Sequence, residues 1–114
     1  MADFINVLRE YGADVEGTLE RFMGDEGLYN QCLYMLFDDE NFNKLLDATN
    51  SLDVSGAFSA AHALKGAVAN LGLTPLFNSI SALVDVLRPG EFVDFKEYSD
   101  KVFSDFNKLK NLFE

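Results

Sequence analysis

Apolar residues recur three and four positions apart along most of the chain, which is the spacing that gathers them on one face of an α-helix. Alternating strand patterns are nearly absent, and the two prolines, Pro75 and Pro89, fall where helices are expected to begin or end. The sequence therefore predicts an all-α protein. The longest stripe with helical spacing lies near the C-terminus and consists of Phe95, Tyr98, Val102, Phe106, Leu109 and Phe113.

Two short helices are expected first, over residues 4–11 and Val15–Met23, and Gly24 ends the second of them. Asp25 is expected to cap the next helix, because a carboxylate accepts hydrogen bonds from the free N–H groups of a first turn. The acidic run Asp38-Asp39-Glu40 marks a break in that helix or the start of another. The helical pattern then continues to Asn50-Ser51.

Three more helices are expected in the second half of the chain. Thr74 is expected as an N-cap with Pro75 at the first helical position, where proline is favoured. Because short loops favour antiparallel neighbours, the sequence predicts an up-down antiparallel four-helix bundle with a short N-terminal helical cap. The three helices run from Asp53 or Ser55 to Leu71-Gly72, from Thr74-Pro75 to about Leu87, and over Val93–Phe113.

The length and charge of the chain restrict both its architecture and its partners. Its 114 residues suit a single domain spanning 1–114. The formal net charge of −10 argues against nucleic acid and anionic membranes as partners, since both are bound through clustered Lys and Arg. No apolar run approaches the ~20 residues that span a bilayer. The N-terminus also lacks the basic and apolar regions of a secretory signal, so a cytoplasmic protein is expected.

The segment Ser55–Gly72 is the part of the chain best suited to carry chemistry. On a helical wheel at about 100° per residue, the face expected in the core separates from the face expected outside. His62 falls on the outer face, nearly opposite Leu64 and Leu71, which argues against a buried core histidine. The core face consists of Ala57, Ala60, Ala61, Leu64, Val68 and Leu71, and the outer face of Ser55, Ser59, His62, Gly66 and Ala69.

His62 is the only histidine, so one copy of the chain cannot build a histidine-based metal cluster, and no metal site is expected. A neutral imidazole is a nitrogen nucleophile that operates near pH 7. Lys65 and Gly66 lie three and four residues on, which makes both of them neighbours of His62 on the helix surface. Lys65 could pair with an anion held at the imidazole. The single cysteine, Cys32, is expected to be a small buried hydrophobe.

Gly66 is unusual in the middle of a helix, where glycine costs about 1 kcal/mol relative to alanine. A glycine in such a place usually has a packing or functional reason. Here the missing side chain clears room beside His62 for another molecule, and Ser59 and Ala69 keep the same face low. An ordinary exposed histidine beside a tolerated glycine is an equally good interpretation of these residues alone.

The residues His62-Ala-Leu64-Lys65-Gly66 are followed, after four further positions, by Leu71-Gly72. This gapless run resembles the motif of histidine phosphotransfer (HPt) domains, His-x-Leu-Lys-Gly-x4-Leu-Gly. Residues 19–29 resemble the segment before the first bundle helix of that family, so the likeness spans most of residues 14–88. The resemblance implies a phosphocarrier of a two-component phosphorelay. It implies no ATP-using enzyme, and the chain has no Gly-rich phosphate loop for a nucleotide.

The resemblance also implies a role for the residues of the motif. His62 would accept and donate the phosphoryl group through Nε2, Lys65 would offset phosphate charge, and Gly66 would permit close approach of the partner. The implied partners are the receiver domains of a hybrid histidine kinase and of a response regulator. In the family the receiver supplies the acceptor aspartate and the Mg²⁺ ion, so no cofactor is expected on this chain alone.

One position departs from the pattern of the family. Where many members place Gln or Glu on the following helix to orient the imidazole, this chain has Val84. Ser81 and Asp85 are the nearby polar residues that could take over this role, and the pattern leaves open which way they point. The loss of the polar residue could change how the ring is held without removing its nucleophilicity.

The face around His62 is expected to be the surface that docks the partner, with Phe58, Ser59, Gly66 and Ala69 as its residues. For Phe58, which lies close to His62 on the wheel, partial burial in the core is an equally good interpretation. The acidic surface favours a monomer.

One alternative function is a non-catalytic four-helix module that binds a receiver without accepting phosphate. Another is the phospho-accepting domain of a chemotaxis-type kinase, which Met1 and the absence of a trailing linker disfavour.

Overall fold

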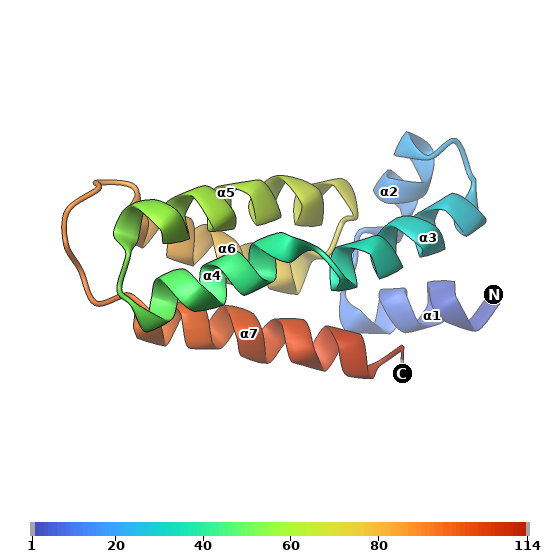
Figure 1. The fold of residues 1–114 in the computed structure, drawn as a ribbon. Coiled ribbons are helices and arrows are strands. Elements are labelled where there is room, and N and C mark those ends of the chain that lie inside the picture. Colours follow the sequence, from blue (N-terminus) through green and yellow to red (C-terminus); the bar gives the residue numbers. More distant parts are fainter. Residues whose placement is uncertain (1, 114) are drawn as a thin grey trace.

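The computed structural model describes residues 2–113, with side chains from Phe4 onward, and over that range it contains helices and no strand (Figure 1). The all-α prediction is therefore confirmed. The helices are α1 (Ala2–Tyr11), α2 (Val15–Arg21), α3 (Glu26–Phe37), α4 (Glu40–Asn50), α5 (Val54–Asn70), α6 (Thr74–Leu87) and α7 (Lys96–Asn111).

Four of the helices begin with an aspartate cap, which explains much of the acidic composition at their boundaries. The Asp25 carboxylate accepts a hydrogen bond from the Leu28 N–H at 2.9 Å, as the sequence predicted. The acidic run 38–40 separates α3 from α4, because its second residue is the cap of α4. Of the two candidates for the cap of α5, Asp53 takes the role. The four caps are Asp14, Asp25, Asp39 and Asp53.

The start of α6 differs from the prediction, because its capping oxygen comes from another helix. Leu73, not Thr74, occupies the N-cap and makes no side-chain capping bond, and Pro75 is the second helical residue. Instead, the Tyr11 hydroxyl at the end of α1 accepts a hydrogen bond from the Leu76 N–H at 3.1 Å. Burial raises the pKa of Tyr11 to about 12. The phenol therefore stays neutral at physiological pH.

The last helix begins at Lys96, three residues later than predicted, and its buried stripe is also different. Phe95 occupies the N-cap with a fully buried ring, and Ser99 takes the inward position that we expected for Tyr98, which is 43% exposed. The reason lies across the bundle, where the buried Thr49 hydroxyl of α4 donates to the Ser99 hydroxyl at 3.0 Å. A buried serine is tolerated because this bond satisfies it.

The helices α4 to α7 form the body of the molecule, and each packs on the next in the sequence (Figure 1). Because α5 packs against both α4 and α6, only one side of it remains for solvent. The N-terminal helices lie at one end of the body, next to the end of α7, and the connection of residues 88–95 lies at the other end. One side of α5 is thus left open along the length of the bundle.

The N-terminal segment holds the C-terminal end of α5 in place. The Arg21 guanidinium donates hydrogen bonds to the carbonyls of Ala69, at 3.3 Å, and Asn70, at 2.9 Å. The buried Tyr29 hydroxyl of α3 donates to the Leu71 carbonyl at 2.8 Å. Carbonyls at a helix end need such partners, because no further turn of the helix satisfies them. This anchoring fixes the direction of α5 relative to α2 and α3.

The carboxylate of Asp105 ties α7 to α6, and we expect it to make stability depend on pH. It accepts hydrogen bonds from the Ser79 hydroxyl and, at 2.9 Å, from Lys101 Nζ. Partial burial alone would raise the pKa of Asp105, but these bonds outweigh it and the pKa is lowered. A carboxyl with a lowered folded-state pKa stabilises the fold above the unfolded value of about 4, and this contribution is lost as the pH falls through the folded pKa.

Urea unfolding of wild type and Asp105→Asn between pH 6 and pH 3 measures this contribution. Wild type is expected to lose more free energy of unfolding on acidification than the variant, and Asp100→Asn, which changes an exposed carboxylate of the same helix, serves as the matched control. Equal pH dependence of wild type and Asp105→Asn would show that the carboxylate does not stabilise the fold.

Candidate functional site

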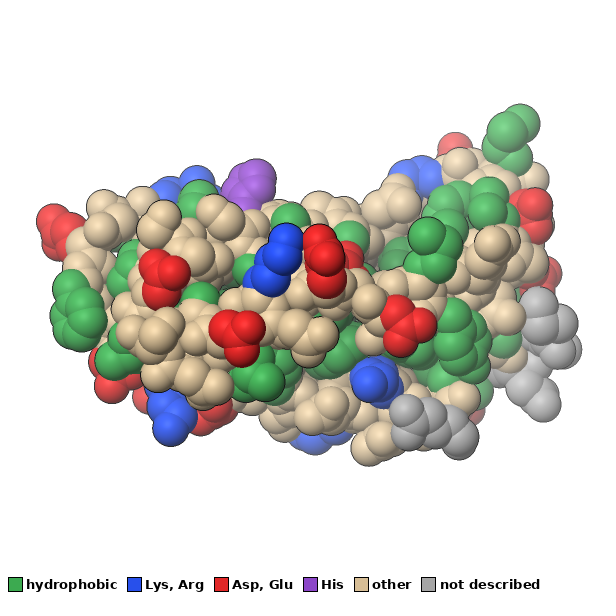
Figure 2. Space-filling model, viewed as in Figure 1, with side chains coloured by type: hydrophobic (Ala, Val, Ile, Leu, Met, Phe, Trp, Pro, Cys, Tyr) green, Lys and Arg blue, Asp and Glu red, His purple; other side chains and the backbone are tan. Residues whose placement is uncertain are grey.

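The open side of α5 carries His62, near the middle of a helix of 17 residues. Alanines in this helix favour helicity and let α4 and α6 approach closely. The predicted core face is confirmed, because every one of its residues is buried. His62 is exposed, and Figure 2 shows the histidine side chain at the upper edge of the molecular surface. The helix therefore presents the one imidazole of the chain to solvent on a rigid support.

One aromatic side chain touches the imidazole of His62. The ring of Phe58, one turn earlier, lies with its centroid 5.7 Å from that of the imidazole, at an interplanar angle of 40°. Phe58 is half-buried and packs against the core, which confirms the interpretation of partial burial in the core, and its role in docking stays a prediction. Across residues 2–113, no hydrogen bond reaches the imidazole from another side chain or from the backbone.

Gly66 leaves open space beside His62. A Cβ atom built on Gly66 would meet nothing within 4 Å, so packing inside the chain does not explain the glycine. Gly72 is different, because it has a φ of +67° and its Cβ would collide with the Thr18 hydroxyl. Ser59 and Ala69, the other small residues predicted on this face, are exposed. Small residues therefore lie beside the imidazole on both neighbouring turns of α5, next to Phe58 on the N-terminal side and Lys65 on the C-terminal side.

Lys65 lies on the side of His62 that faces α6. Its ammonium stands over the ring of Phe77, with Nζ 5.8 Å from the ring centroid, in the geometry of a cation–π contact. Lys65 is half-buried, so its stem covers part of the junction between α5 and α6. A positive charge thus stands on the helix surface one turn from the imidazole.

The polar residues suggested to replace the missing Gln or Glu do not touch His62. Val84 is fully buried in the core. The Ser81 hydroxyl is buried and has no hydrogen-bond partner within the described residues. Asp85 is exposed, and its carboxylate lies 3.9 Å from the guanidinium of Arg88, the C-cap residue of α6. The structure therefore places none of these three side chains where it would hold the imidazole by a hydrogen bond.

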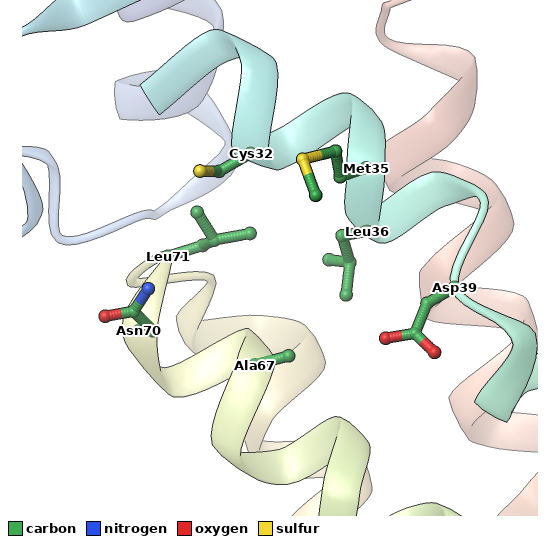
Figure 3. A pocket seen from close by; sticks show the side chains of 7 residues that line it. All are labelled: Cys32, Met35, Leu36, Asp39, Ala67, Asn70 and Leu71. Atoms are coloured by element: carbon green, nitrogen blue, oxygen red, sulfur yellow. The ribbon is translucent and has the colours of Figure 1, made fainter. Parts of the chain in front are cut away.

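A shallow pocket of about 230 Å³ lies beside this face, between α3 and the C-terminal half of α5 (Figure 3). We did not predict it from the sequence. Met35, on its α3 side, is 65% exposed, and Cys32 is half-buried, which corrects the expectation that this cysteine is a buried hydrophobe. The only sequence signal was the spacing of Leu28, Cys32 and Met35 along one side of α3. The pocket is lined by Cys32, Met35, Leu36, Asp39, Ala67, Asn70 and Leu71.

The sequence model of the Hpt domain matches residues 33–112, which is more than half of the chain. The chain belongs to the Hpt domain family. The match begins within α3 and ends just after α7, so it includes the whole of the helix that bears His62. Hpt domains carry out histidine phosphotransfer in two-component signalling and interact there with receiver domains. Comparison with curated proteins and with solved structures finds no match.

The described residues of this Hpt domain contain neither a helix suited to a membrane nor a cluster suited to a metal. No helix in residues 2–113 combines the length and the apolar character needed to cross a bilayer. In the same range, no three side chains of His, Cys, Asp or Glu gather in a way that could hold a metal ion. The imidazole of His62 thus has the Phe58 ring beside it and the Lys65 ammonium on the next turn, where Lys65 in turn contacts Phe77.

Proposed function

We propose that this Hpt domain is a phosphocarrier that holds a phosphoryl group on His62 between the aspartates of two receiver domains. The observation that carries the proposal is the open space at Gly66, beside an exposed imidazole on a rigid helix. A mid-helix glycine that costs stability, and that packing does not require, is explained by the approach of another molecule.

In the transfer step, the lone pair of Nε2 forms a bond to phosphorus as the bond between phosphorus and the aspartyl oxygen of the donor breaks. The aspartate leaves as a carboxylate, and the imidazole keeps the proton on Nδ1. Transfer to the second receiver is the reverse reaction, with the N–P bond breaking as a new O–P bond forms. Such reactions depend on positioning and charge neutralisation more than on covalent machinery in the protein.

Lys65 is the residue of this chain proposed to offset phosphate charge. The ammonium is held by a single aromatic contact at a half-buried position, so it can shift towards a phosphoryl group on the neighbouring turn. The Mg²⁺ ion is proposed to come with the receiver. The carrier has no ATP site of its own in this scheme and is therefore not an enzyme.

The proposed docking surface combines the face of His62 with the neighbouring pocket. Phe58, Ser59, Gly66 and Ala69 form the first part, and Met35 lies at the rim of the second. Ala67 and Asn70 line the pocket from α5, so the two parts belong to one continuous surface. The occupant is a receiver domain, because the phosphoryl group must come within bonding distance of the imidazole.

The remaining features of the proposal concern the molecule as a whole. Residues 1–114 act as one domain, a cytoplasmic monomer built as an up-down antiparallel four-helix bundle. The bundle consists of α4 to α7 with α3 extending α4, and α1 and α2 form the N-terminal cap. The donor is the receiver of a hybrid histidine kinase, and the acceptor is the receiver of a response regulator.

Phosphorylation with a small phosphoramidate tests the proposal. Wild type is expected to gain one acid-labile phosphoryl group, measured by intact mass, and to lose it when Mg²⁺ and a suitable receiver domain are added. His62→Gln is the control and should gain none. Failure of wild type to take up phosphate, or to pass it to any member of a broad receiver panel, would contradict the carrier function.

The alternative function is a module that binds a receiver without accepting phosphate. The observation that favours it is the buried, apolar Val84, which cannot orient the imidazole. A receiver that binds wild type and His62→Gln equally well, with no phosphate on either, would support this alternative. Calorimetric titration of the two proteins with the same receiver measures the binding, and the phosphoramidate assay decides whether the bound protein is also a carrier.

A further inference from the structure

The imidazole of His62 lacks polar support for its orientation. No hydrogen bond reaches it within residues 2–113, and the side chain of Val84 points into the core instead. An exposed histidine turns about two side-chain torsions and populates several rotamers. Transfer, however, requires the attacking nitrogen to be aligned with the phosphoryl group. Some other group must therefore restrict the ring, or the site would lose rate to misaligned orientations.

Phe58 is the side chain in a position to restrict it. Side chains on a helix lean towards its N-terminus, so the imidazole of His62 lies over the turn that carries Phe58. The centroid distance of 5.7 Å lies within the range of about 4.5–7 Å in which aromatic rings attract each other. Phe58 is itself packed against the core, so its ring offers a fixed surface.

We propose that Phe58 is a positioning residue, whose core-anchored ring confines the imidazole of His62 to the orientation used in phosphoryl transfer. This inference rests on the proposed carrier function and adds a second role to a residue of the docking surface. The tilted ring of Phe58 contacts the imidazole from one side, while the small residues Gly66 and Ala69 leave the opposite direction along the helix open. An aromatic contact thus does the work of the missing hydrogen bond.

The test compares wild type with Phe58→Leu, which keeps an apolar side chain but removes the ring, and with Phe58→Tyr, which keeps the ring. Phe103→Leu is the matched control, since Phe103 is a half-buried phenylalanine of α7 that contacts Phe42 and not the imidazole. Because the chain has one histidine, its ring protons give a single set of NMR signals. The NOEs of these protons, together with the Hα–Hβ couplings of His62, report its rotamer populations, and thermal unfolding checks that each variant is folded.

Phe58→Leu is expected to spread the imidazole over more rotamers. It should slow phosphoramidate uptake, and lower kcat for transfer from a receiver, by about twofold to tenfold, the ratio that corresponds to one aromatic pair. Because Phe58 also belongs to the docking surface, KM for the receiver is expected to rise as well, and the slower phosphoramidate uptake, which needs no docking, isolates the positioning role. Phe58→Tyr should restore the wild-type rotamers and rates, and Phe103→Leu should leave them unchanged.

Two results would overturn the positioning role. One is an unchanged distribution of imidazole rotamers in Phe58→Leu. The other is a rise in KM for the receiver with normal phosphoramidate uptake, which would make Phe58 a docking residue only. If wild type takes up no phosphate, the carrier function fails, and the NMR comparison still decides whether Phe58 holds the ring.

Discussion

Gly66→Leu is expected to make the chain more stable and at the same time to block its transfer reaction with a receiver. Leucine is a better helix former than glycine by somewhat less than the ~0.8–1 kcal/mol that separates glycine from alanine, and a Cβ at this position meets no atom within 4 Å. Stability should therefore rise by a similar amount. The new side chain would occupy the surface on which the receiver closes. Transfer should fall about thirtyfold or more, which corresponds to the ~2 kcal/mol of a central interface contact.

Urea unfolding and transfer kinetics measure the two effects, and uptake from a phosphoramidate provides the internal control. The small donor needs no docking surface, so its reaction with His62 should remain close to that of wild type. Ser104→Leu adds the same side chain to an exposed position of α7 and should transfer normally. Wild-type transfer by Gly66→Leu would show that the receiver does not approach over this residue.

Met35→Glu is expected to raise KM for the receiver about tenfold or more, because a carboxylate buried without a partner in an interface costs more than ~1.4 kcal/mol. Met35 is 65% exposed at the rim of the pocket between α3 and α5, so the substitution leaves the core of the domain unchanged. The value of kcat and the rate of phosphoramidate uptake should remain normal, since no group at the imidazole is altered.

Leu112→Glu is the control for charge, because it adds the same carboxylate at an exposed leucine, the C-cap of α7, which does not line the pocket. A general electrostatic repulsion would raise KM in both variants equally. A difference between them assigns the effect to the pocket. Equal values, or no change in either, would remove the pocket from the docking surface.

The sequence was sufficient to predict the helices and the orientation of α5. On α5 the residues of the predicted core face and those of the predicted outer face lie on opposite sides of the helix. The burial of Leu64 and the exposure of His62 therefore follow from helical periodicity alone. Asp25 and Asp53 could be predicted as caps because capping is a local interaction between a carboxylate and the next turn. Local rules of this kind need no knowledge of the neighbouring helices.

The features that the sequence could not predict depend on contacts between helices. Ser99 is inward because Thr49 lies opposite it on α4, and without that partner the larger Tyr98 was the reasonable choice for the core. The start of α6 is capped by Tyr11, a residue 65 positions away. No residue near Thr74 in the sequence predicts that hydrogen bond.

The pocket beside His62 escaped prediction for a related reason. Helix α3 carries apolar residues on several sides, including Tyr29, Leu33 and Leu36 in the core and Met35 outside. When several sides of a helix are apolar, hydrophobic periodicity cannot predict which of them is buried and which is exposed. Which side remains open is decided by the angle at which α5 approaches α3, and this angle depends on the bonds that Arg21 and Tyr29 make to the end of α5.

The solitary imidazole has a consequence for signalling if the carrier function holds. One histidine limits each molecule to one phosphoryl group, so the number of phosphoryl groups that this carrier can hold equals its copy number. No side chain bonded to the ring favours uptake over release in the described residues. The phosphorylated fraction of the carrier would then be set by the phosphorylation levels of the two receivers with which it exchanges the group.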